Sequence, residues 1–517
     1  MSSTLASSVS GDAATARWRP LKALLGGGVE VRADLEVSDL TLDSRSVRPG
    51  AAFLACRGTR QHGLAFARQA ASAGARAILW EPAPGVAAPD LSDSVVLVAV
   101  PDLTAQAGFI ADRFFDAPSA SVKAIGVTGT NGKTTCAWLL ALALDQLGMS
   151  AAYLGTLGVG RVDALREATH TTPDAISLQR ALARERDAGM QAVAMEVSSH
   201  ALDQQRCNGV RFQIAAFTNL SRDHLDYHGT MERYGAAKAQ LFDWPTLAGR
   251  VINVDDEFGQ ELAARLRTSP SLLLTARRNA AVAGLGARHL LATAVETGAA
   301  GVAMQLRGSF GSAQLRSRLL GEFNVDNLLT VCGVLLALDQ KLPRICEVLT
   351  ACSAPPGRME TQGGGALPLV VVDYAHTPDA LAKALRAARS HASGRLWCVF
   401  GCGGERDAGK RPLMGAIASE LADQLIVTDD NPRGEDAAVI TSAIVAGTAN
   451  PAAVVVIHDR AAAIARAVQS ASAGDVVLVA GKGHEPYQLI GTERRPFLDR
   501  SAAAAALRRR QAAGASP

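Results

Sequence analysis

The chain has 517 residues, too many for a single hydrophobic core, so we expect about three domains. Hydrophobic residues make up 48% and charged residues 20% of it, a balance typical of folded globular proteins that excludes a disordered chain. The formal net charge is only +3, so charge gives no case for a nucleic-acid partner, and a small-molecule substrate is expected.

The sequence predicts neither a membrane segment nor a secretion signal. Its longest strongly apolar run, residues 328–338, is shorter than the ~20 residues of a membrane-spanning helix. Residues 1–20 are rich in Ser and Ala, lack the apolar core of a signal peptide, and are predicted to be a loose tail. None of the eight cysteines forms a C-x-x-C pair, which indicates reduced thiols. We therefore expect a cytoplasmic protein without membrane insertion.

Residues 21–118 are predicted to form a small α/β domain. Strand-like runs at 51–56 and 95–100 alternate with helical stretches at 64–74 and 103–115. The polar turns between these elements carry little functional signal by themselves.

Residues 122–135 (VKAIGVTGTNGKTT) predict a phosphate-binding loop. A short apolar strand, 124–127, precedes a glycine turn, and an apolar-periodic helix is expected at 136–147. Glycines allow backbone N–H groups to approach phosphate oxygens, and the helix start adds its dipole. Lys133 would neutralise the terminal phosphates, and the Thr134 hydroxyl would reach Mg²⁺. Val127 stands where the strict pattern has glycine, so this is a variant of the motif.

Two further strands are predicted to follow the phosphate-binding loop in the same domain. A buried strand at 191–197 carries Glu196 at its end, where a carboxylate can hold Mg²⁺ directly or through water. A second strand at 214–217 runs into a polar segment, and Lys238 lies on the helix after it. Residues 272–320 alternate strands and turns without evident chemistry.

Residues after the hinge-like segment 355–357 are predicted to form another doubly wound domain, with polar residues at the carboxyl ends of its strands. The final helix, from Ser501, is expected to be solvated. The expected strands are 367–372, 396–400, 424–428, 454–457 and 475–480, with helices at 380–390 and 413–422.

Seven segments together resemble the Mur ligases of bacterial cell-wall synthesis, over roughly residues 40–485, although no single segment would suffice. They are 128–135 (TGTNGKTT), 196–200 (EVSSH), 219–226 (NLSRDHLD), 373–379 (DYAHTPD), 401–407 (GCGGERD), 430–433 (DNPR) and 481–485 (GKGHE).

This resemblance implies an α/β protein with three domains: a smaller N-terminal α/β domain (21–118), a central P-loop ATPase with a doubly wound sheet (119–352), and a C-terminal Rossmann-like domain (353–517). It implies an ATP-dependent ligase of peptidoglycan synthesis, with Mg²⁺ as cofactor. The reaction would join meso-diaminopimelate to the D-glutamate side-chain carboxylate of UDP-N-acetylmuramoyl-L-alanyl-D-glutamate, through an acyl phosphate. A monomer is expected.

The resemblance also implies roles for individual residues in the nucleotide site. Catalytic roles fall on Lys133, Glu196, His224 and Lys238, and Lys238 would be carbamylated. Metal-binding roles fall on Thr134, Glu196, His224 and the modified Lys238. ATP-binding roles fall on Gly129, Thr130, Asn131, Gly132, Lys133, Thr134, Thr135, Asn327, Arg358 and Asp373.

Two further sets follow from the same resemblance. Residues matching the UDP-muramoyl-peptide site are Leu42, Ser44, Thr59, Arg60, Gln61, Thr171, Thr172, Ser198, Gln204 and Arg206. Residues matching the diaminopimelate site are Arg406, Asp430, Asn431, Pro432, Arg433, Gly481 and Glu485. Glu405 and Ala408 depart from a loop that often carries Asp and Lys.

Several alternatives stay open. The same ligase could use L-lysine, but lysine has no far carboxylate for an arginine to bind bidentately, which favours diaminopimelate. A folylpolyglutamate synthase is disfavoured because about 100 residues, a domain in themselves, precede the phosphate loop. A P-loop switch or motor would not need the last two motifs. Ser198 and His200 could suggest a hydrolase, but no G-x-S-x-G elbow surrounds Ser198.

Overall fold

The computed structural model describes residues 17–26, 29, 31, 35–58, 61–91, 94–168, 170–282, 284, 287–298 and 301–514. The chain divides into two compact units. The first comprises residues 1–121, 173–187 and 203–210, and the second comprises 122–172, 188–202 and 211–517. Two segments that the sequence analysis assigned to the central domain therefore pack with the N-terminal residues.

The first unit is built on a parallel four-stranded sheet, in the order β3-β4-β5-β6. Strands β4 and β6 and helix α3 confirm three predicted elements, whereas β5 was not predicted. The predicted helix at 64–74 is a 3₁₀ turn followed by the short helix α2. The elements of this unit are β1 (Arg19–Pro20), α1 (Leu21–Leu25), β2 (Glu36–Val37), β3 (Leu40–Thr41), η1 (Ser44–Ser46), β4 (Ala52–Ala55), η2 (Gly63–Phe66), α2 (Ala67–Ser72), β5 (Ala77–Trp80), β6 (Val96–Ala99), α3 (Leu103–Phe114), η3 (Pro118–Ala120) and α5 (Ala175–Asp187).

The predicted loose tail is only partly within the described residues. Residues 1–16 lie outside them. The remainder is ordered: β1 pairs antiparallel with β2, and the Arg17 guanidinium forms an ion pair with Asp187 over 2.9 Å. The expectation of a loose segment is therefore wrong for residues 17–20.

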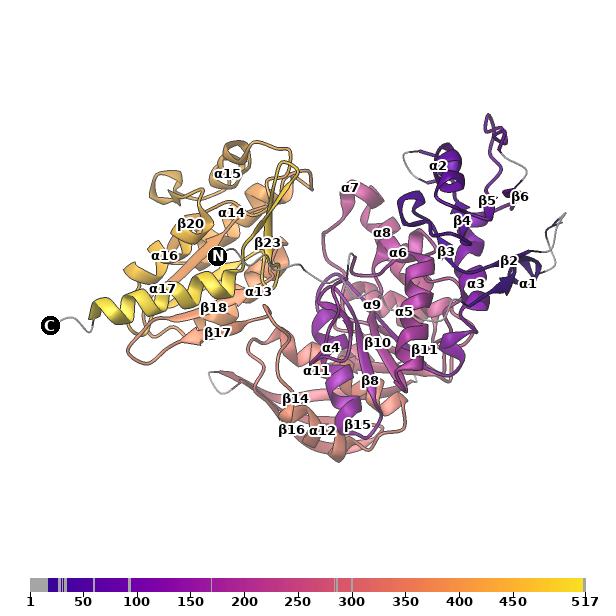
Figure 1. The fold of residues 1–517 in the computed structure, drawn as a ribbon. Helices are drawn as coiled ribbons and strands as arrows, with labels where there is room; N and C mark the ends of the chain where they lie inside the picture. Colours follow the sequence, from indigo (N-terminus) through magenta and orange to yellow (C-terminus); the bar gives the residue numbers. More distant parts are fainter. Residues whose placement is uncertain are drawn as a thin grey trace, which may run out of the picture. The chain divides into compact units, whose positions relative to one another are not determined.

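Within the described part of the second unit, the larger sheet has ten strands in the order β16-β15-β14-β13-β12-β11-β7-β10-β8-β9 (Figure 1). Strands β7, β8 and β10 to β14 run parallel, while β9, β15 and β16 are antiparallel to their neighbours. Its elements are β7 (Lys123–Thr128), α4 (Lys133–Gln146), β8 (Ala151–Gly155), β9 (Gly158–Gly160), β10 (Ala192–Glu196), α6 (Ser199–Asp203), β11 (Phe212–Phe217), α7 (Leu225–His228), α8 (Met231–Ala239), η4 (Gln240–Asp243), β12 (Gly249–Asn253), α9 (Glu257–Arg265), β13 (Leu272–Ala276), α10 (Asn279–Val282), β14 (Arg288–Gly298), β15 (Gly301–Gly308), β16 (Gly311–Ser317), α11 (Phe323–Ala337) and α12 (Leu342–Ala351).

Alternation of side chains along the parallel strands explains how helices cover this sheet. Ile125 and Val127 of β7 point to the same face, because successive residues of a strand face opposite sides. They belong to one buried cluster with residues of α4, α11 and α12. The strand before the phosphate-binding loop therefore packs directly against the helix that follows the loop.

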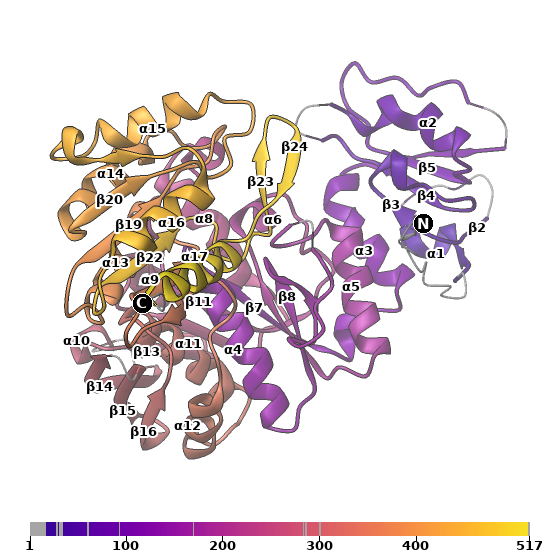
Figure 2. The ribbon, with the colours of Figure 1, turned by 60° about the vertical axis from the view of Figure 1, so that its left-hand side comes forward.

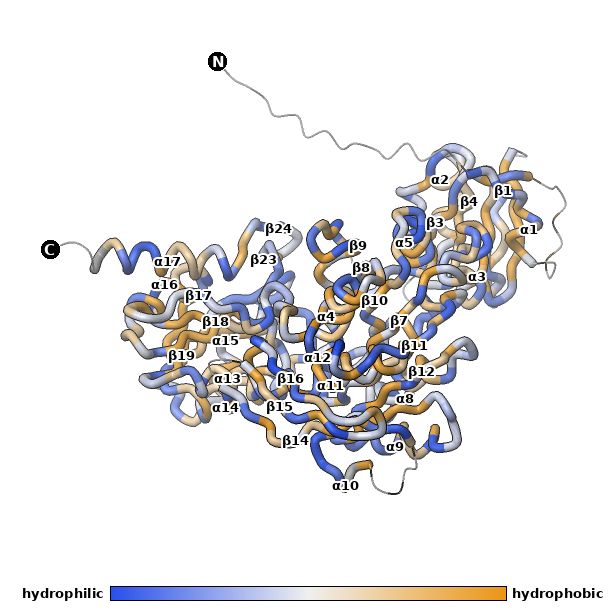
Figure 3. The backbone as a smooth tube through the Cα atoms, turned by 90° about the horizontal axis from the view of Figure 1, so that it is seen from below, coloured by the Kyte–Doolittle hydropathy of each residue, from blue (hydrophilic) through white to orange (hydrophobic). Residues whose placement is uncertain are grey.

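Among the residues that the structure describes, the smaller sheet of this unit has six strands, in the order β17-β18-β22-β19-β20-β21, and only β17 is antiparallel. Figure 3 shows β18 and β19 of this sheet coloured largely as hydrophobic, and the residues of β19 are buried. Strands β23 (Tyr487–Ile490) and β24 (Glu493–Pro496) form a separate antiparallel pair. The other elements of this part are β17 (Glu360–Gly363), β18 (Leu369–Asp373), α13 (Pro378–Arg389), β19 (Leu396–Phe400), α14 (Lys410–Leu421), β20 (Gln424–Val427), α15 (Ala437–Val445), η5 (Pro451–Ala453), β21 (Val455–Val456), α16 (Arg460–Ser470), β22 (Val476–Ala480) and α17 (Asp499–Gly514).

Helices cover both faces of this sheet, as expected for a doubly wound domain. One face packs against α13, α14 and α15, and the other packs against α16 and α17. Helix α17 lies along α16 in Figure 2. Its Ala503, Ala506 and Leu507 are buried in the second cluster, so the expectation of a solvated terminal helix is wrong. The buried face of α17 was not predicted, because a helix composed largely of alanine shows little hydrophobic periodicity.

Two further predictions from the sequence concern membrane-spanning helices and the cysteines. Within the described chain, no helix is both long and apolar enough to cross a bilayer. All eight cysteines are free, and seven of them are buried, as the sequence predicted for core thiols.

Candidate active site

The phosphate-binding loop connects β7 to α4 and has the predicted strand–loop–helix form. Helix α4 begins at Lys133, three residues earlier than predicted. Gly132 has φ +85°, and a Cβ there would lie 2.3 Å from Asn327 Oδ1, so only glycine fits. The Lys133 ammonium donates hydrogen bonds of 2.8 Å to the Gly129 and Thr130 carbonyls. Burial lowers the pKa of Lys133.

Glu196 ends β10, the strand beside β7, and its carboxylate is held from several directions. One oxygen accepts a hydrogen bond from the Thr134 hydroxyl over 2.8 Å. The other accepts from the Thr156 backbone N–H over 2.9 Å and from the Tyr153 hydroxyl. Glu196 is thus buried and oriented toward the first turn of α4.

Lys238 lies on α8, and its side chain is 1% exposed. Its Nζ donates to the Gly129 carbonyl over 2.8 Å and lies 4.3 Å from the centre of the Tyr234 ring. Burial, with the charge of Lys133 adding to it, lowers the pKa of Lys238 well below its ordinary value. The neutral amine is therefore favoured beside the phosphate loop.

His224 and Asp223 follow β11 and face the same cavity. His224 Nε2 lies 3.4 Å from an Asp223 carboxylate oxygen. Burial lowers the pKa of His224 to about 3, although the Asp223 charge opposes this shift. His224 is therefore neutral at physiological pH, the form in which histidine can bind a metal ion.

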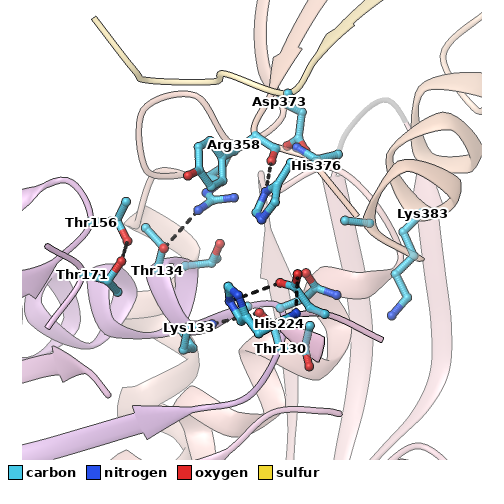
Figure 4. A pocket seen from close by; sticks show the side chains of 18 of the residues that line it. Thr130, Lys133, Thr134, Thr156, Thr171, His224, Arg358, Asp373, His376 and Lys383 are labelled. Carbon is cyan, nitrogen blue, oxygen red and sulfur yellow. Dashed lines mark hydrogen bonds and ion pairs between the residues drawn. The ribbon is translucent and has the colours of Figure 1, made fainter. Parts of the chain in front are cut away.

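Arg358 reaches the phosphate loop from the segment that precedes the smaller sheet (Figure 4). Its guanidinium donates to the Thr134 hydroxyl over 3.1 Å and stacks 4.3 Å from the centre of the Tyr374 ring. Asp373, at the end of β18, accepts hydrogen bonds of 2.8 Å from the Met359 and Ala375 N–H groups. Burial raises the pKa of Asp373.

The residues that match a diaminopimelate site come together at the carboxyl ends of β19, β20 and β22. The Arg433 guanidinium donates to the Gly404 carbonyl over 2.8 Å, and the Asn431 amide donates to Glu485 over 2.9 Å. Arg406 has neither a hydrogen bond nor an ion pair with any residue that the structure describes. A Cβ on Gly481, which has φ +115°, would lie 2.6 Å from an Asp430 oxygen.

The two predicted groups line one cavity of about 380 Å³. Of the residues expected at the ATP and metal sites, all but Gly129 line it, and of the diaminopimelate set all but Pro432 do. Arginines from one sheet and phosphate-binding groups from the other therefore face a common space.

The residues expected at the UDP-muramoyl-peptide site divide between the two units. Leu42, Ser44, Gln61, Gln204 and Arg206 belong to the first unit, and Thr171, Thr172 and Ser198 belong to the second. Thr59 and Arg60 lie outside the described residues.

Local contacts explain the orientation of several of these side chains. The Ser44 hydroxyl donates to Gln69 over 2.9 Å, and Arg206 Nε donates to Gln204 over 2.9 Å. The Thr172 hydroxyl donates to the Glu196 carbonyl over 2.9 Å. Ser198 accepts a hydrogen bond from the Ala201 N–H over 3.2 Å, as a helix-capping serine does.

Among the described residues, no three His, Cys, Asp or Glu side chains come together as a metal-binding group. The expected metal set contains only two such residues, Glu196 and His224. A second carboxylate, and so a third ligand of this kind, would have to come from carbamylated Lys238.

Sequence reasoning missed Tyr374, which lines this cavity, and Lys482 and Tyr153, which support lining residues. Lys482, fully buried, donates hydrogen bonds of 2.9 Å to Asn431 and 2.8 Å to Glu485. Tyr374 lines the cavity, and its ring packs against the Arg358 guanidinium. Lys482 lies within the segment 481–485 and Tyr374 within 373–379, so the sequence motifs could have indicated both residues. Tyr153 carries no such signal, because its contact with Glu196 depends on the pairing of β8 with β10.

A strand, a lysine-bearing glycine loop and a helix, with an acidic residue on the neighbouring parallel strand, define an α/β nucleotide-binding protein of the P-loop type. Three family models match consecutive parts of the chain: the Mur ligase family catalytic domain (residues 36–107), the Mur ligase middle domain (127–335) and the Mur ligase glutamate ligase domain (357–483). The chain belongs to the Mur ligase family, whose three-domain α/β fold it has.

Two curated relatives are both named UDP-N-acetylmuramoyl-L-alanyl-D-glutamate–2,6-diaminopimelate ligase. The one from Ectopseudomonas mendocina (strain ymp) is 52% identical over 90% of this chain and 93% of its own length. The one from Pseudomonas aeruginosa is 51% identical over 90% and 94%. A solved structure of a ligase with the same name is 35% identical, with a TM-score of 0.67, over 96% of this chain and 99% of that one.

Proposed function

We propose that this chain is an ATP-dependent ligase that joins meso-diaminopimelate to the D-glutamate side-chain carboxylate of UDP-N-acetylmuramoyl-L-alanyl-D-glutamate, a step of peptidoglycan synthesis. One observation carries the proposal: the phosphate loop and the Arg406–Arg433–Asp430–Glu485 group line a single cavity. Relatives of about half-identical sequence bear the name of this ligase.

The reaction needs both parts of that cavity. A carboxylate does not react with an amine, so its oxygen first attacks the γ-phosphorus of ATP and ADP leaves. The resulting acyl phosphate is attacked at carbon by the neutral amine. Phosphate then leaves, the nitrogen loses a proton, and the amide remains.

Cationic side chains of this chain would bind the triphosphate and the transferred phosphoryl group. Lys133 and Arg358 carry the charge, and the loop N–H groups from Gly129 to Thr135 supply donors. The phosphoryl acceptor is itself an anion, so these charges reduce the repulsion as the two reactants meet. Asn327 and Asp373 are proposed to contact the rest of the nucleotide.

The oxygen-rich donor set fits Mg²⁺, a hard cation that prefers carboxylate and hydroxyl oxygens. Glu196 and Thr134 would hold it, as their mutual 2.8 Å contact allows. His224 and carbamylated Lys238 would complete a second position. When bound, the ion neutralises phosphate charge.

Charge complementarity explains why the amino acid would be diaminopimelate. Its far end carries a carboxylate and an ammonium. The unpartnered Arg406 and the Arg433 guanidinium would bind the carboxylate, while Asp430 and Glu485 would bind the ammonium. L-Lysine would leave guanidinium groups without a partner, and is the alternative substrate to test.

The remaining assignments are proposals on the same basis. The UDP-muramoyl-peptide set would hold the nucleotide-sugar substrate, and domain boundaries are placed near residues 118 and 352. One chain carries every proposed residue, so we propose a monomer. Because the proposed substrates are ATP and a UDP-linked precursor, we propose that the reaction takes place in the cytoplasm.

A ligation assay tests the proposal. Purified protein should release phosphate only when ATP, the nucleotide substrate and meso-diaminopimelate are all present, and product mass should rise by one diaminopimelate residue. Preference for L-lysine would change the substrate assignment. ATP turnover without any amino acid, or nucleotide-dependent binding of a protein partner without amide formation, would contradict the proposal.

A further inference from the structure

A buried ion pair beneath the proposed amino-acid site joins the terminal helix to the smaller sheet. Arg460 begins α16 and Asp499 begins α17, and both side chains are 0% exposed. The guanidinium donates to the two Asp499 carboxylate oxygens over 2.7 and 2.8 Å. Such a bidentate pair fixes the orientation of the guanidinium plane.

The same guanidinium also holds two backbone segments of the sheet. It donates to the Ala480 carbonyl over 2.9 Å and to the Asp429 carbonyl over 3.5 Å. Ala480 is the last residue of β22 and directly precedes Gly481. Asp429 follows β20 and directly precedes Asp430. Arg460 therefore connects the carboxyl ends of two strands that lie on either side of β19.

Both connected segments continue into the cavity. Asp430 and Gly481 line it, and a Cβ added at Gly481 would lie 2.6 Å from an Asp430 oxygen, so the two loops pack closely here. Gln488 supports the same backbone, since its amide donates to the Asp429 and Asp430 carbonyls over 3.3 and 3.0 Å. The geometry of Asp430 thus depends on groups outside the cavity.

Helix α17 sets the position of Asp499. Its Ala503, Ala506 and Leu507 pack with Ile464 and Ala467 of α16 against the strands. This packing fixes the position of Asp499, whose partner Arg460 contacts the ends of the strands that carry the proposed diaminopimelate residues.

We propose that Arg460 and Asp499 are positioning residues of the amino-acid site, and that α17 belongs to that site functionally although it does not line the cavity. This inference rests on the proposed function. It predicts that losing the pair weakens binding of the amino acid selectively, while the phosphate loop, held by the other sheet, keeps its affinity for ATP.

The test compares steady-state kinetics of the full-length enzyme and three variants. Paired replacement, Arg460→Met with Asp499→Leu, removes the guanidinium bonds but preserves apolar packing, and such exchanges of buried pairs are often tolerated. Asp499→Asn is the second variant. Arg500→Ala is the matched control, because it removes an exposed pair with Glu360 from the same helix.

For the paired variant and for Asp499→Asn, we expect the KM for meso-diaminopimelate to rise about tenfold to a hundredfold, while the KM for ATP changes less than about twofold. Hydrogen exchange should quicken in peptides covering 428–433 and 481–485, with α17 itself still protected in the paired variant. The Arg500→Ala control should match the wild type within about twofold.

Two results would overturn the inference. One is an unchanged KM for meso-diaminopimelate in a folded paired variant, which would mean that the pair only fastens α17. The other is an equal rise in the KM of all three substrates, which would indicate general loosening. Failure of the proposed function is seen separately, because the wild-type arm would then form no diaminopimelate amide.

Discussion

The Arg358 guanidinium donates a hydrogen bond to the Thr134 hydroxyl over 3.1 Å, although the two residues are 224 positions apart. Thr134 is the second residue of α4, the helix after the phosphate loop, and Arg358 precedes the first strand of the smaller sheet. Arg358 Nε is buried without a hydrogen-bond partner within the described chain. This Nε–H group can therefore donate a hydrogen bond to an anionic ligand.

Arg358→Lys should lower kcat/KM for ATP by about tenfold to a hundredfold, since one charged hydrogen bond contributes about 1.5–3 kcal/mol. Lysine keeps the charge but cannot make the planar contacts with both Thr134 and Tyr374. Initial rates at varied ATP check this. Arg389→Lys, at an exposed pair with Asp423, is the control and should leave the rate unchanged. A wild-type rate in Arg358→Lys would contradict a role in phosphate binding.

Tyr153→Phe should lower kcat by about tenfold, because it removes one of the three donors that orient Glu196. The ring itself stays packed, with its centroid 5.9 Å from that of Trp138, so the thermal stability should change little. Glu196→Gln should be more severe and should also shift the Mg²⁺ concentration that gives half-maximal rate. If Tyr153→Phe changes neither kcat nor the Mg²⁺ concentration that gives half-maximal rate, the hydroxyl does not orient the carboxylate.

Arg433→Ala should raise the KM for meso-diaminopimelate by about a hundredfold and reduce the preference over L-lysine, because a charge-assisted bidentate contact is lost. The KM for ATP should stay within about twofold. Competition assays with both amino acids measure the ratio. Arg495→Ala, an exposed site in β24 paired with Glu493, is the matched control. An unaltered selectivity would remove Arg433 from the specificity site.

Lys238 should be carbamylated at neutral pH in the presence of CO₂, since its lowered pKa keeps the amine neutral and nucleophilic. ¹³C-labelled bicarbonate should give a carbamate NMR signal that Lys238→Ala lacks. The variant should lose most activity, and short carboxylic acids should restore part of it. Lys123→Ala, at an exposed position in β7, should keep the signal. A signal that persists in Lys238→Ala would place the modification elsewhere.

Acid should destabilise the fold through His484, whose pKa burial lowers to about 3, with the charge of Arg358 adding to the effect. In the unfolded chain the pKa is about 6.5, so between these values only the unfolded state binds this proton. Stability from the neutral ring is therefore complete above pH about 6.5 and declines as the pH falls toward 3.

His484→Phe should make this acid dependence shallower. Urea midpoints measured from neutral to mildly acidic pH check the prediction, with the wild type falling more steeply than the variant. His458→Phe is a suitable comparison, because that imidazole is half exposed beside Asp429. Parallel curves for wild type and His484→Phe would show that His484 does not contribute.

The strands of the smaller sheet could be predicted because each is a continuous run of apolar residues in the sequence. Strand β19 matches its predicted range, and β18, β20 and β22 lie within two residues of theirs. Buried parallel strands are unbroken apolar runs bounded by polar turns, so the pattern is readable locally. In the other sheets, strands β5 and β8 were missed, because apolar runs of four or five residues are too short to indicate a strand by periodicity alone.

The phosphate loop was readable for the same reason: strand, glycines, Lys133 and helix start are consecutive residues with one backbone chemistry. Sequence resemblance also indicated which arginines and carboxylates to expect. The partners of those groups came only from the fold. Thr134 meets Arg358, Glu196 meets Tyr153, and Asp499 meets Arg460 because sheets and helices bring distant segments together. Local periodicity carries the secondary structure and the loop chemistry, whereas contacts between elements depend on strand order and helix packing, which no short stretch of residues encodes.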